Sequence, residues 1–372
     1  MGTGFVWHEL FMWHSTGCHA GIYKPGLTIQ PGTPFEEAET KRRFKNLLDV
    51  SGITDDLFHI RPRALRRDEL EMVHSAAYLD ELEAMSKAGG GAFSANTPFG
   101  AGSYDIAALS AGGVIEAVDA VMRGDVKNAY ALVRPPGHHA VADAAMGFCL
   151  FANGSLAAKH AIEKHGLERV AIVDWDVHHG NGAQDIFWES SKVLTISIHQ
   201  KGNYPSDSGC AEERGLGAGA GYNLNIPMLP GSGHGAYLGA MDTLIVPALR
   251  EFDPQLIIVS CGFDAGAYDP LGRMLLHSDS FRDLTQRVME AADISCKGKL
   301  VMCHEGGYEQ NTVPYMGLVV IETLSGIKTG ISDPNLDDMK GLFGQETQSY
   351  QREHLMEIRK LLQCPAETAR RS

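Results

Sequence analysis

The stretch VAIVDWDVHHGNG, residues 170–182, decides the fold of this chain. Its first four residues are apolar throughout, which is typical of a strand buried on both faces in a parallel sheet covered by helices. Asp174, Asp176 and His178 follow at alternate positions, so in an extended chain their side chains point to one side. Because open parallel sheets bind ligands beyond the carboxyl ends of their strands, these three residues mark a candidate site.

Similar apolar runs recur along the chain and alternate with segments of helical spacing. We expect strands at Phe5–Phe11, Leu57–Arg61, Ala129–Arg134, Arg169–Asp174, Val193–Ile198, Gln255–Cys261 and Lys299–His304. We expect helices at Phe35–Val50, Tyr104–Arg123, Ala152–His165, Gly235–Phe252, Ser280–Ile294 and Pro314–Leu324, and an exposed helix at Glu346–Gln363 with a short tail beyond it. This alternation predicts a single α/β domain over residues 1–372, with a core from about residue 5 to residue 330.

The composition narrows the class of protein. The 372 residues are 44% hydrophobic and 21% charged, which is typical of a globular chain with a large core. A formal net charge of −14 argues against a nucleic-acid-binding surface. No apolar run approaches the roughly 20 residues of a membrane helix, and the first residues lack the basic start of a signal peptide. The seven cysteines include no CxxC pair and indicate unpaired thiols, so we expect a cytoplasmic protein. From the charge and the short apolar runs, we expect that it binds neither nucleic acid nor membranes.

Three further predicted strands run straight into ionisable residues. ALVRPPGHHA contains His138 and His139, LIIVSCGFDAG contains Asp264, and KLVMCHEGGYE ends near Tyr308. Taken singly, each has a structural interpretation, since an aspartate after a strand usually caps the next helix and a lone histidine is more often scaffold. Taken together, buried carboxylates at one sheet edge would repel each other and lose their solvation, and a divalent cation resolves that conflict.

Asp176, His178 and Asp264 therefore form a candidate metal site of one imidazole and two carboxylates. Three protein ligands with an open position are the layout of a catalytic site rather than a structural one. Mixed nitrogen and oxygen ligands suit zinc, with iron(II), cobalt and manganese as alternatives.

Two carboxylates neutralise the formal charge of a dication and should make it a weaker Lewis acid than one bound by three imidazoles. The reaction then needs nearby bases and a second electrophile. His138 and His139 are the candidates for proton transfer, and Tyr308 is the candidate hydroxyl donor to a developing oxyanion.

Five strings, RPPGHHA, MGFCLFAN, DWDVHHGNG, GFDAGAYDPLG and HEGGY, resemble in this order the motifs of the histone deacetylase family, within the arginase/deacetylase superfamily. The resemblance extends over about residues 5–330 and is strongest to bacterial, class II-like histone deacetylase-like amidohydrolases. It implies a single domain with a central, mostly parallel, eight-stranded sheet flanked by helices. It also implies one zinc ion and one or two potassium ions per chain, hydrolysis of acetyl- or short-acyl-lysine amides, and a homo-oligomer, either a dimer or a tetramer.

The resemblance also implies roles for individual residues. The three candidate metal ligands match the family's zinc ligands. His139 matches the general base, His138 matches its electrostatic or proton-donating partner, and Tyr308 matches the tyrosine that polarises the scissile carbonyl. Asp174 and Asn181 match the residues that hold the two histidines, and Asn181 is an amide where class I members carry aspartate.

A substrate tunnel and potassium sites follow from the same resemblance. The tunnel is expected at Gly147, Phe148, Tyr204, Leu271, Gly306 and Gly307. One potassium site is expected at Asp174, Ser197 and the carbonyls of Asp176, His178 and Ile198, and a second at the carbonyls of Phe187, Ser190, Val193 and Tyr222. Tyr204 stands where the family usually has phenylalanine. Leu271 stands where polyamine-selective members have an acidic residue, so a cationic polyamine is not the expected substrate.

Three other functions are considered beside the acyl-lysine deacylase. A deacylase of small acylated amines, such as acetylpolyamines, would use the same residues. A catalytically silent acyl-binding protein would have lost a metal ligand, His139 or Tyr308, and none is lost. A two-manganese ureohydrolase of the arginase type needs additional carboxylates, whereas His178 is followed by His179 and Gly180.

Overall fold

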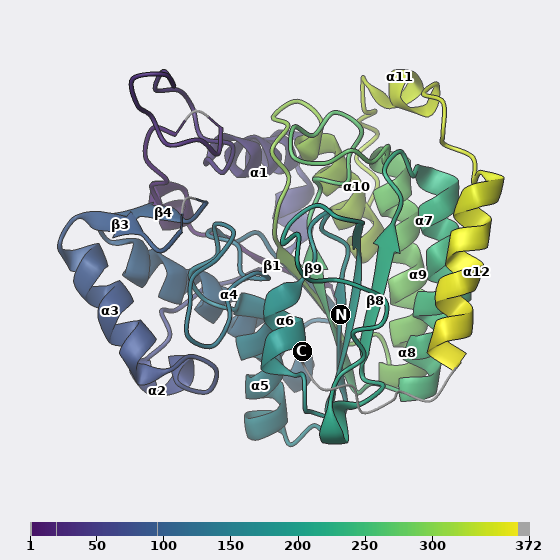
Figure 1. Cartoon of the computed structure of the whole chain (residues 1–372), viewed down its shortest axis with the longest axis horizontal. Helices are drawn as coiled ribbons and strands as arrows, with labels where there is room; N and C mark the ends of the chain where they lie inside the picture. Colours follow the sequence, from purple (N-terminus) through teal and green to yellow (C-terminus); the bar gives the residue numbers. More distant parts are fainter. Residues whose placement is uncertain (1, 20, 95, 364–372) are drawn as a thin grey trace.

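The computed structural model describes residues 2–19, 21–94 and 96–363. Within them, one eight-stranded sheet has the order β2-β1-β5-β10-β9-β6-β7-β8, and every neighbouring pair is parallel (Figure 1). Its strands are β1 (Thr3–Val6), β2 (Phe58–Ile60), β5 (Asn128–Ala131), β6 (Val170–Asp174), β7 (Val193–Gln200), β8 (Asn223–Met228), β9 (Leu256–Cys261) and β10 (Leu300–His304). A separate antiparallel pair joins β3 (Gly90–Ala92) to β4 (Pro98–Gly100). The predicted α/β class and parallel sheet are confirmed.

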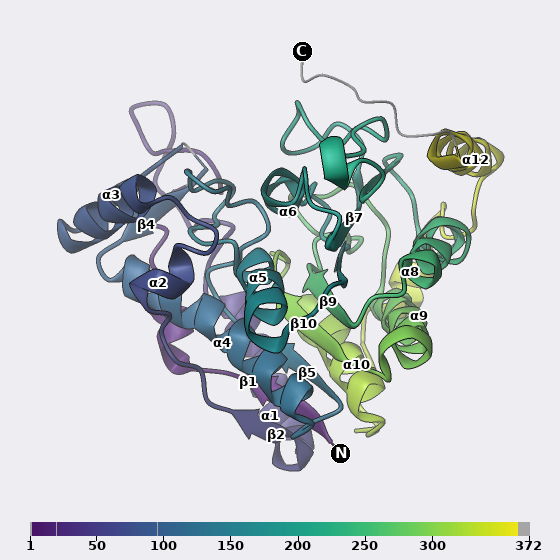
Figure 2. The same ribbon diagram turned by 90° about the horizontal axis from the view of Figure 1, so that it is seen from below.

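Helices cover both faces of the sheet (Figures 1 and 2). They are α1 (Glu39–Ser51), α2 (Arg67–Leu70), α3 (Ala76–Lys87), α4 (Ser103–Arg123), α5 (Asn153–His165), α6 (Asn181–Ile186), α7 (His234–Ala240), α8 (Val246–Phe252), α9 (Ser278–Cys296), α10 (Val313–Ser325), α11 (Leu336–Lys340) and α12 (Ser349–Gln363). Residues of α1, α7–α10 and α12 share one core cluster, and residues of α3–α5 share the other. Along β6, Val173 belongs to the first cluster and Ile172 to the second, so this strand is buried on both faces as its sequence predicted.

Both the start of the sheet and one of its edges differ from the prediction. The first strand ends at Val6 because a 3-10 helix, Glu9–Trp13, follows it, and His8 Nδ1 accepts a hydrogen bond from the Leu10 N–H. Strand β8 has no predicted counterpart. It contains Pro227, which is tolerated because β8 is an edge strand and a missing N–H there breaks no inner ladder.

The predicted helix Gly235–Phe252 is divided into α7, a π-helical turn at Met241–Ile245, and α8. Pro247 explains the interruption, because proline has no N–H to donate and its ring clashes with the carbonyl four residues earlier. The short helices α2, α6 and α11 and the longer α3 had no predicted counterparts.

The C-terminal helix is less exposed than predicted. Leu355 and Ile358 of α12 are buried, and the helix contacts α7 and β8. His354 Nε2 lies 2.7 Å from the carbonyl oxygen of Pro227 in β8. The tail predicted after residue 363 lies outside the described residues. In the described part of the chain, no helix combines the length and the apolar character needed to cross a membrane.

A buried ion cluster joins the N-terminal segment to the segment that follows β5. The Arg134 guanidinium donates to both carboxylate oxygens of Glu36 at 2.8 Å and to the carbonyls of Phe11 and His14 at 3.2 and 2.6 Å. Lys41 Nζ donates to the same Glu36 carboxylate at 3.2 Å. The helix predicted from residue 35 begins only at residue 39, and Glu36, in the segment before it, belongs to this cluster.

The cluster contains two cations and one anion, all of them buried. Burial disfavours the charged form of Glu36, but the charges of Arg134 and Lys41 outweigh burial and lower its pKa to about 2. The Glu36 carboxylate therefore stays ionised and offsets two buried positive charges. This matters for the site because Arg134 is followed four residues later by His138.

We expect Glu36→Gln to lower the free energy of unfolding by about 3–5 kcal/mol, because it leaves two buried cations without their carboxylate. Lys41→Met is the matched control. It leaves a balanced Arg134–Glu36 pair and should change stability by less than about 1.5 kcal/mol. Urea unfolding followed by circular dichroism measures both effects, and equal losses in the two variants would contradict the importance of charge balance.

The stability of wild type and that of Glu36→Gln should respond differently to acid. Because folding lowers the pKa of Glu36 from 4.5 to about 2, its stabilisation is complete above about pH 4.5 and is lost as the pH falls toward 2. The stability difference between wild type and Glu36→Gln should therefore shrink over this interval.

Candidate metal centre and substrate pocket

Asp176, His178 and Asp264 meet at the carboxyl edge of the sheet. The first two follow β6 and the third follows β9, its hydrogen-bonded neighbour. His178 Nδ1 lies 2.9 Å from Asp176 Oδ1 and 3.0 Å from Asp264 Oδ2. All three side chains are buried, and one donor atom of each lies within 4.8 Å of the other two. The three predicted ligands therefore surround one point.

Backbone groups orient the two carboxylates. Asp264 Oδ1 accepts a hydrogen bond from the Val177 N–H at 2.7 Å, and Asp176 Oδ2 accepts one from the Gly306 N–H at 2.8 Å. A Cβ atom on Gly306 would lie 2.2 Å from Asp264 Oδ2 and 2.6 Å from Asp176 Oδ2. A glycine is therefore required at position 306, where the chain passes directly beside both carboxylates.

The electrostatics of these residues fit a bound dication. Burial and the adjacent Asp176 charge raise the pKa of Asp264. Burial opposes a charge on His178, but the carboxylates of Asp176 and Asp264 outweigh it and raise the His178 pKa to about 10. Although Asp264 Oδ2 is near His178, it has no aligned hydrogen-bond donor among the described residues. One imidazole nitrogen and two carboxylate oxygens gathered around one point suit a dipositive ion.

The paired histidines are each held through Nδ1. His138 Nδ1 lies 2.9 Å from Asp174 Oδ2, and His139 Nδ1 lies 2.7 Å from Asn181 Oδ1. Their ring centroids are 3.9 Å apart. An amide oxygen only accepts hydrogen bonds, so Nδ1 of His139 carries a hydrogen and its Nε2 is free to accept a proton.

The two histidines have opposite protonation preferences. Burial lowers the pKa of His138, but the carboxylates of Asp176 and Asp174 outweigh burial and raise it. Burial also lowers the pKa of His139, and the charges of His138 and His178 lower it further. Adjacent groups whose pKa values are displaced in opposite directions are typical of acid–base sites.

Glu305, which was not predicted from the sequence, follows β10 and binds the backbone of the segment that contains His138. Its Oε2 accepts hydrogen bonds from the N–H groups of Gly137 at 2.6 Å and His138 at 3.1 Å. It lies within the HEGGY string, but nothing in the sequence spacing relates it to His138.

Asp269 has a similar role on the other side of the site. Its two oxygens accept hydrogen bonds from the N–H groups of Leu271 and Tyr308, each at 2.8 Å. Tyr308 is also near the ion cluster, since Lys41 Nζ lies 5.5 Å from the centroid of its ring. Asp269 lies within the GFDAGAYDPLG string, where roles were predicted for Asp264 and Leu271 but none for Asp269.

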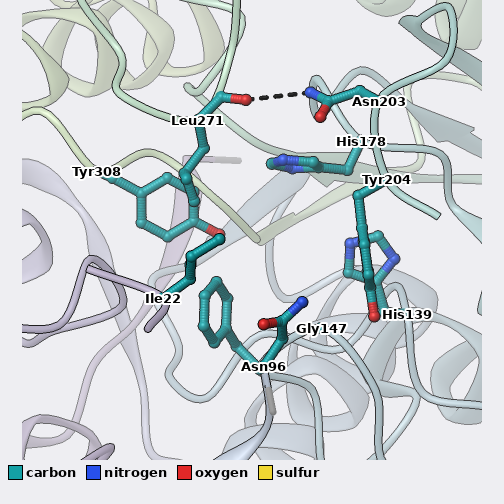
Figure 3. A pocket seen from close by; sticks show the side chains of 10 residues that line it. Ile22, Asn96, His139, Gly147, His178, Asn203, Tyr204, Leu271 and Tyr308 are labelled. Carbon is teal, nitrogen blue, oxygen red and sulfur yellow. Dashed lines mark hydrogen bonds between the residues drawn. The ribbon is translucent and has the colours of Figure 1, made fainter. Parts of the chain in front are cut away.

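A pocket leads from the surface to these groups and has a volume of about 460 Å³, including its open mouth (Figure 3). It is lined by Ile22, Asn96, His139, Gly147, Phe148, His178, Asn203, Tyr204, Leu271 and Tyr308. Four of the six predicted tunnel residues are on this lining. Gly306 instead lies beside the carboxylates, and Gly307 packs on Phe263. Ile22, Asn96 and Asn203 were not predicted, because they come from loops without a recognisable motif.

Aromatic rings form two sides of the pocket. Tyr308, Leu271 and Ile22 lie on one side, and Tyr204 and His139 lie on the other (Figure 3). The Tyr204 ring packs edge-on against His139, with centroids 4.9 Å apart. Across the pocket, the carbonyl of Leu271 accepts a hydrogen bond from Asn203 Nδ2 at 3.1 Å.

Gly147 allows the two rings to approach. It has a φ of +51°, and a Cβ there would lie 2.3 Å from the ring of His139 and 2.9 Å from that of Tyr204. Phe148 follows it and packs edge-on against Tyr308, with centroids 5.9 Å apart.

Some of the residues predicted to bind potassium are neighbours in the structure. Asp174 and Ser197 are partners in the β6–β7 ladder. The Ser190 N–H donates to the Phe187 carbonyl at 2.9 Å, and the Tyr222 carbonyl accepts a hydrogen bond within the β7–β8 region. These contacts do not test ion binding, so both potassium sites stay predictions.

Known proteins share both the sequence and the fold. The sequence model of the histone deacetylase domain matches residues 33–324. The histone deacetylase-like amidohydrolase of Pseudomonas aeruginosa is 51% identical over 339 residues, which cover 90% of this chain and 89% of that protein. The human polyamine deacetylase HDAC10 is 35% identical over 350 residues, which cover 88% of this chain and 48% of that protein. The crystal structure of the HDA15 HD domain matches with a TM-score of 0.84 at 31% identity, over 97% of this chain and 96% of that one.

We expect Gly306→Ala to lower the affinity for a divalent ion at least about 100-fold, because the new Cβ displaces both carboxylates. Gly239→Ala, in α7, is the matched control, since its Cβ would meet only Leu355 at 3.7 Å. Metal content after dialysis against a chelator, with circular dichroism to verify folding, measures the effect. Unchanged metal affinity in Gly306→Ala would contradict joint binding by Asp176 and Asp264.

Proposed function

This chain belongs to the histone deacetylase family, and on that premise we propose that it is a zinc-dependent amidohydrolase acting on acetylated or short-acylated amines, above all the lysine side chain. The proposal is supported chiefly by one observation. The three candidate metal donors lie together, and one of them, His178, lines a pocket whose walls also include His139 and Tyr308.

Asp176, His178 and Asp264 would hold the zinc ion, each through one donor atom. When bound, the ion supplies a Lewis acid that polarises the acyl carbonyl and lowers the pKa of water. The remaining tasks are proton transfer and stabilisation of a developing oxyanion, and they fall to the protein's own residues.

His139 is the proposed general base. Its Nε2 takes a proton from the attacking water while the Asn181 oxygen holds its Nδ1–H in place. A low pKa keeps the imidazole neutral before the attack. Beside it, His138 is held by Asp174 and favours the charged form, which stabilises the negative charge of the tetrahedral intermediate. The proton that His139 accepts is then passed to the nitrogen of the leaving amine.

Tyr308 is the proposed hydroxyl donor to the acyl oxygen as negative charge develops. Its backbone is fixed by Asp269, and its ring contacts Phe148 and the Lys41 ammonium. A donor fixed in this way needs no rearrangement during the reaction, which is the condition for effective oxyanion stabilisation.

The pocket walls support a substrate with an aliphatic stem. Phe148 and Tyr204 would pack along the stem of an acyl-lysine, and apolar Leu271 lies on the lining as well. The two potassium sites and assembly into a dimer or tetramer remain part of the proposal on the strength of family resemblance.

Deacylation of small acylated amines is a second candidate. It is favoured by the 35% identity to human HDAC10, whose name describes a polyamine deacetylase. Leu271 argues against it, because an apolar side chain offers no charge partner for a second ammonium group.

Tyr308→Phe removes the proposed oxyanion donor and should lower kcat about 10²–10³-fold. We expect the variant to fold and to bind one zinc ion per chain as wild type does, which separates a chemical effect from lost metal. Hydrolysis of an acetyl-lysine peptide, together with metal quantification, measures both quantities. Turnover close to that of wild type would refute the role given to Tyr308.

Leu271→Glu should shift the ratio of kcat/KM values toward acetylputrescine by about tenfold relative to an acetyl-lysine peptide. A favourable charge contact of about 1.4 kcal/mol produces this ratio. Leu271→Gln has a similar size without the charge and should leave the ratio almost unchanged. Wild type should prefer the peptide, and a preference for acetylputrescine would favour the second candidate function.

A further inference from the structure

A second group of metal-binding side chains lies between α4 and α5. Asp119 belongs to α4, and His160 and His165 belong to α5. Asp119 Oδ1 lies 2.7 Å from the Nε2 atoms of both histidines, and one donor atom of each residue lies within 4.8 Å of the other two. We propose that this cluster binds one divalent transition-metal ion, with zinc or nickel as the best fit, and thereby clips α4 to α5.

The cluster is separate from the pocket. His165 is the last residue of α5, and the chain enters β6 at Val170, so the cluster lies near the amino end of β6. The pocket donors Asp176 and His178 follow the carboxyl end of the same strand. An ion in the cluster would therefore lie away from the residues proposed to carry out the reaction.

The donor set matches the chemistry of late first-row dications. Imidazole nitrogens suit zinc, nickel and copper, and one carboxylate adds a charged oxygen ligand. The side chains of Asp119 and His165 are 19% and 22% exposed, whereas that of His160 is 7% exposed. Water can thus reach the cluster and complete the coordination around three protein donors.

The carboxylate is already ionised and directed at both rings. Burial raises the pKa of Asp119, but hydrogen bonds from His160 and His165 outweigh burial and lower it to about 2. Because the Nε2 atoms of both histidines lie within hydrogen-bond distance of the same carboxylate oxygen, all three donors surround one point. This convergence of two imidazoles on one carboxylate oxygen is the geometric observation that carries the proposal.

Binding requires two small adjustments. In a tetrahedral zinc site with bonds of about 2.0–2.1 Å, neighbouring donors lie roughly 3.3 Å apart. Each Nε2–Oδ1 distance must therefore widen from 2.7 Å by roughly 0.6 Å. Both rings must also carry their hydrogen on Nδ1, which frees Nε2 for the ion.

The second adjustment sets the expected affinity. His165 is partly exposed, so water can accept its Nδ1–H. Nδ1 of His160 is buried and has no hydrogen-bond partner among the described residues. Metal-binding histidines without such a partner lose about 10–100-fold in affinity. We therefore expect a dissociation constant in the micromolar range, weaker than that of the pocket site.

Zinc titration of the full chain tests the proposal. The protein is first stripped with a chelator, then dialysed against buffered zinc, and bound metal is counted by mass spectrometry. Wild type should bind two ions per chain, and His165→Ala should bind one. Lys164→Ala alters the adjacent exposed residue of the same helical turn without removing a ligand, and it should still bind two.

Two further measurements keep the outcome decisive. Gly306→Ala should lose the pocket ion but keep the cluster ion, so failure of one site is distinguishable from failure of the other. Nickel should raise the Tm of wild type and Lys164→Ala by more than that of His165→Ala, which keeps only the pocket donors, since each ion that binds only the folded state stabilises it. If wild type and His165→Ala bind equal numbers of ions up to millimolar zinc, the cluster is only a hydrogen-bonded brace and the proposal is overturned.

Discussion

Two carboxylates, Asp176 and Asp264, lie buried together because parallel strands end at a common edge, and their charges must be offset there. Several neighbouring groups help to offset these charges or make room for the carboxylates. Backbone N–H groups bind the outer oxygens, Gly306 leaves room beside them, and His178 supplies a proton or a place for a cation. Without a metal ion, a protonated His178 is what offsets the two carboxylates, since like charges at close range in a dry site are unfavourable. Under the proposed function, a cation would offset both charges, so folding at this edge and cation binding would be coupled, and the ion would act as a Lewis acid beside the pocket.

Other charged residues in the interior near that centre are also paired with partners. Beyond the metal donors lie His138 with Asp174, and Glu305 holds the backbone of the same histidine segment. Further in, Arg134 and Glu36 tie the N-terminal segment to the segment that carries the histidines. Each pair satisfies groups that would be costly to bury alone. The result explains how residues before α1, distant in sequence from the motifs, contribute to the geometry of the pocket.

The sequence predicted the parts of the structure that periodicity and strand ends encode. The apolar runs located seven of the eight strands of the sheet, and residues at four strand ends met in one site. It missed β8, whose apolar run is interrupted by asparagine and proline, and the π-helical turn before Pro247. It also missed Glu305 and Asp269, because a side chain that accepts backbone N–H groups has no fixed spacing to its donors. Residues on the pocket wall such as Asn96 come from loops, where only the folded chain brings them to the site.

The unit formed by α5 and β6 connects the two sites that this structure suggests. Helix α5 ends at His165, in the Asp119 cluster. Strand β6 ends just before Asp176 and His178, two of the candidate metal ligands. The strand itself is fixed by parallel ladders to β7 on one side and β9 on the other. A clip between α4 and α5 therefore adds stability at the far end of the unit, whereas the ladders set the positions of Asp176 and His178. Because β6 is already held along its whole length, an ion at the cluster can stabilise the fold without changing the geometry on which the proposed hydrolysis depends.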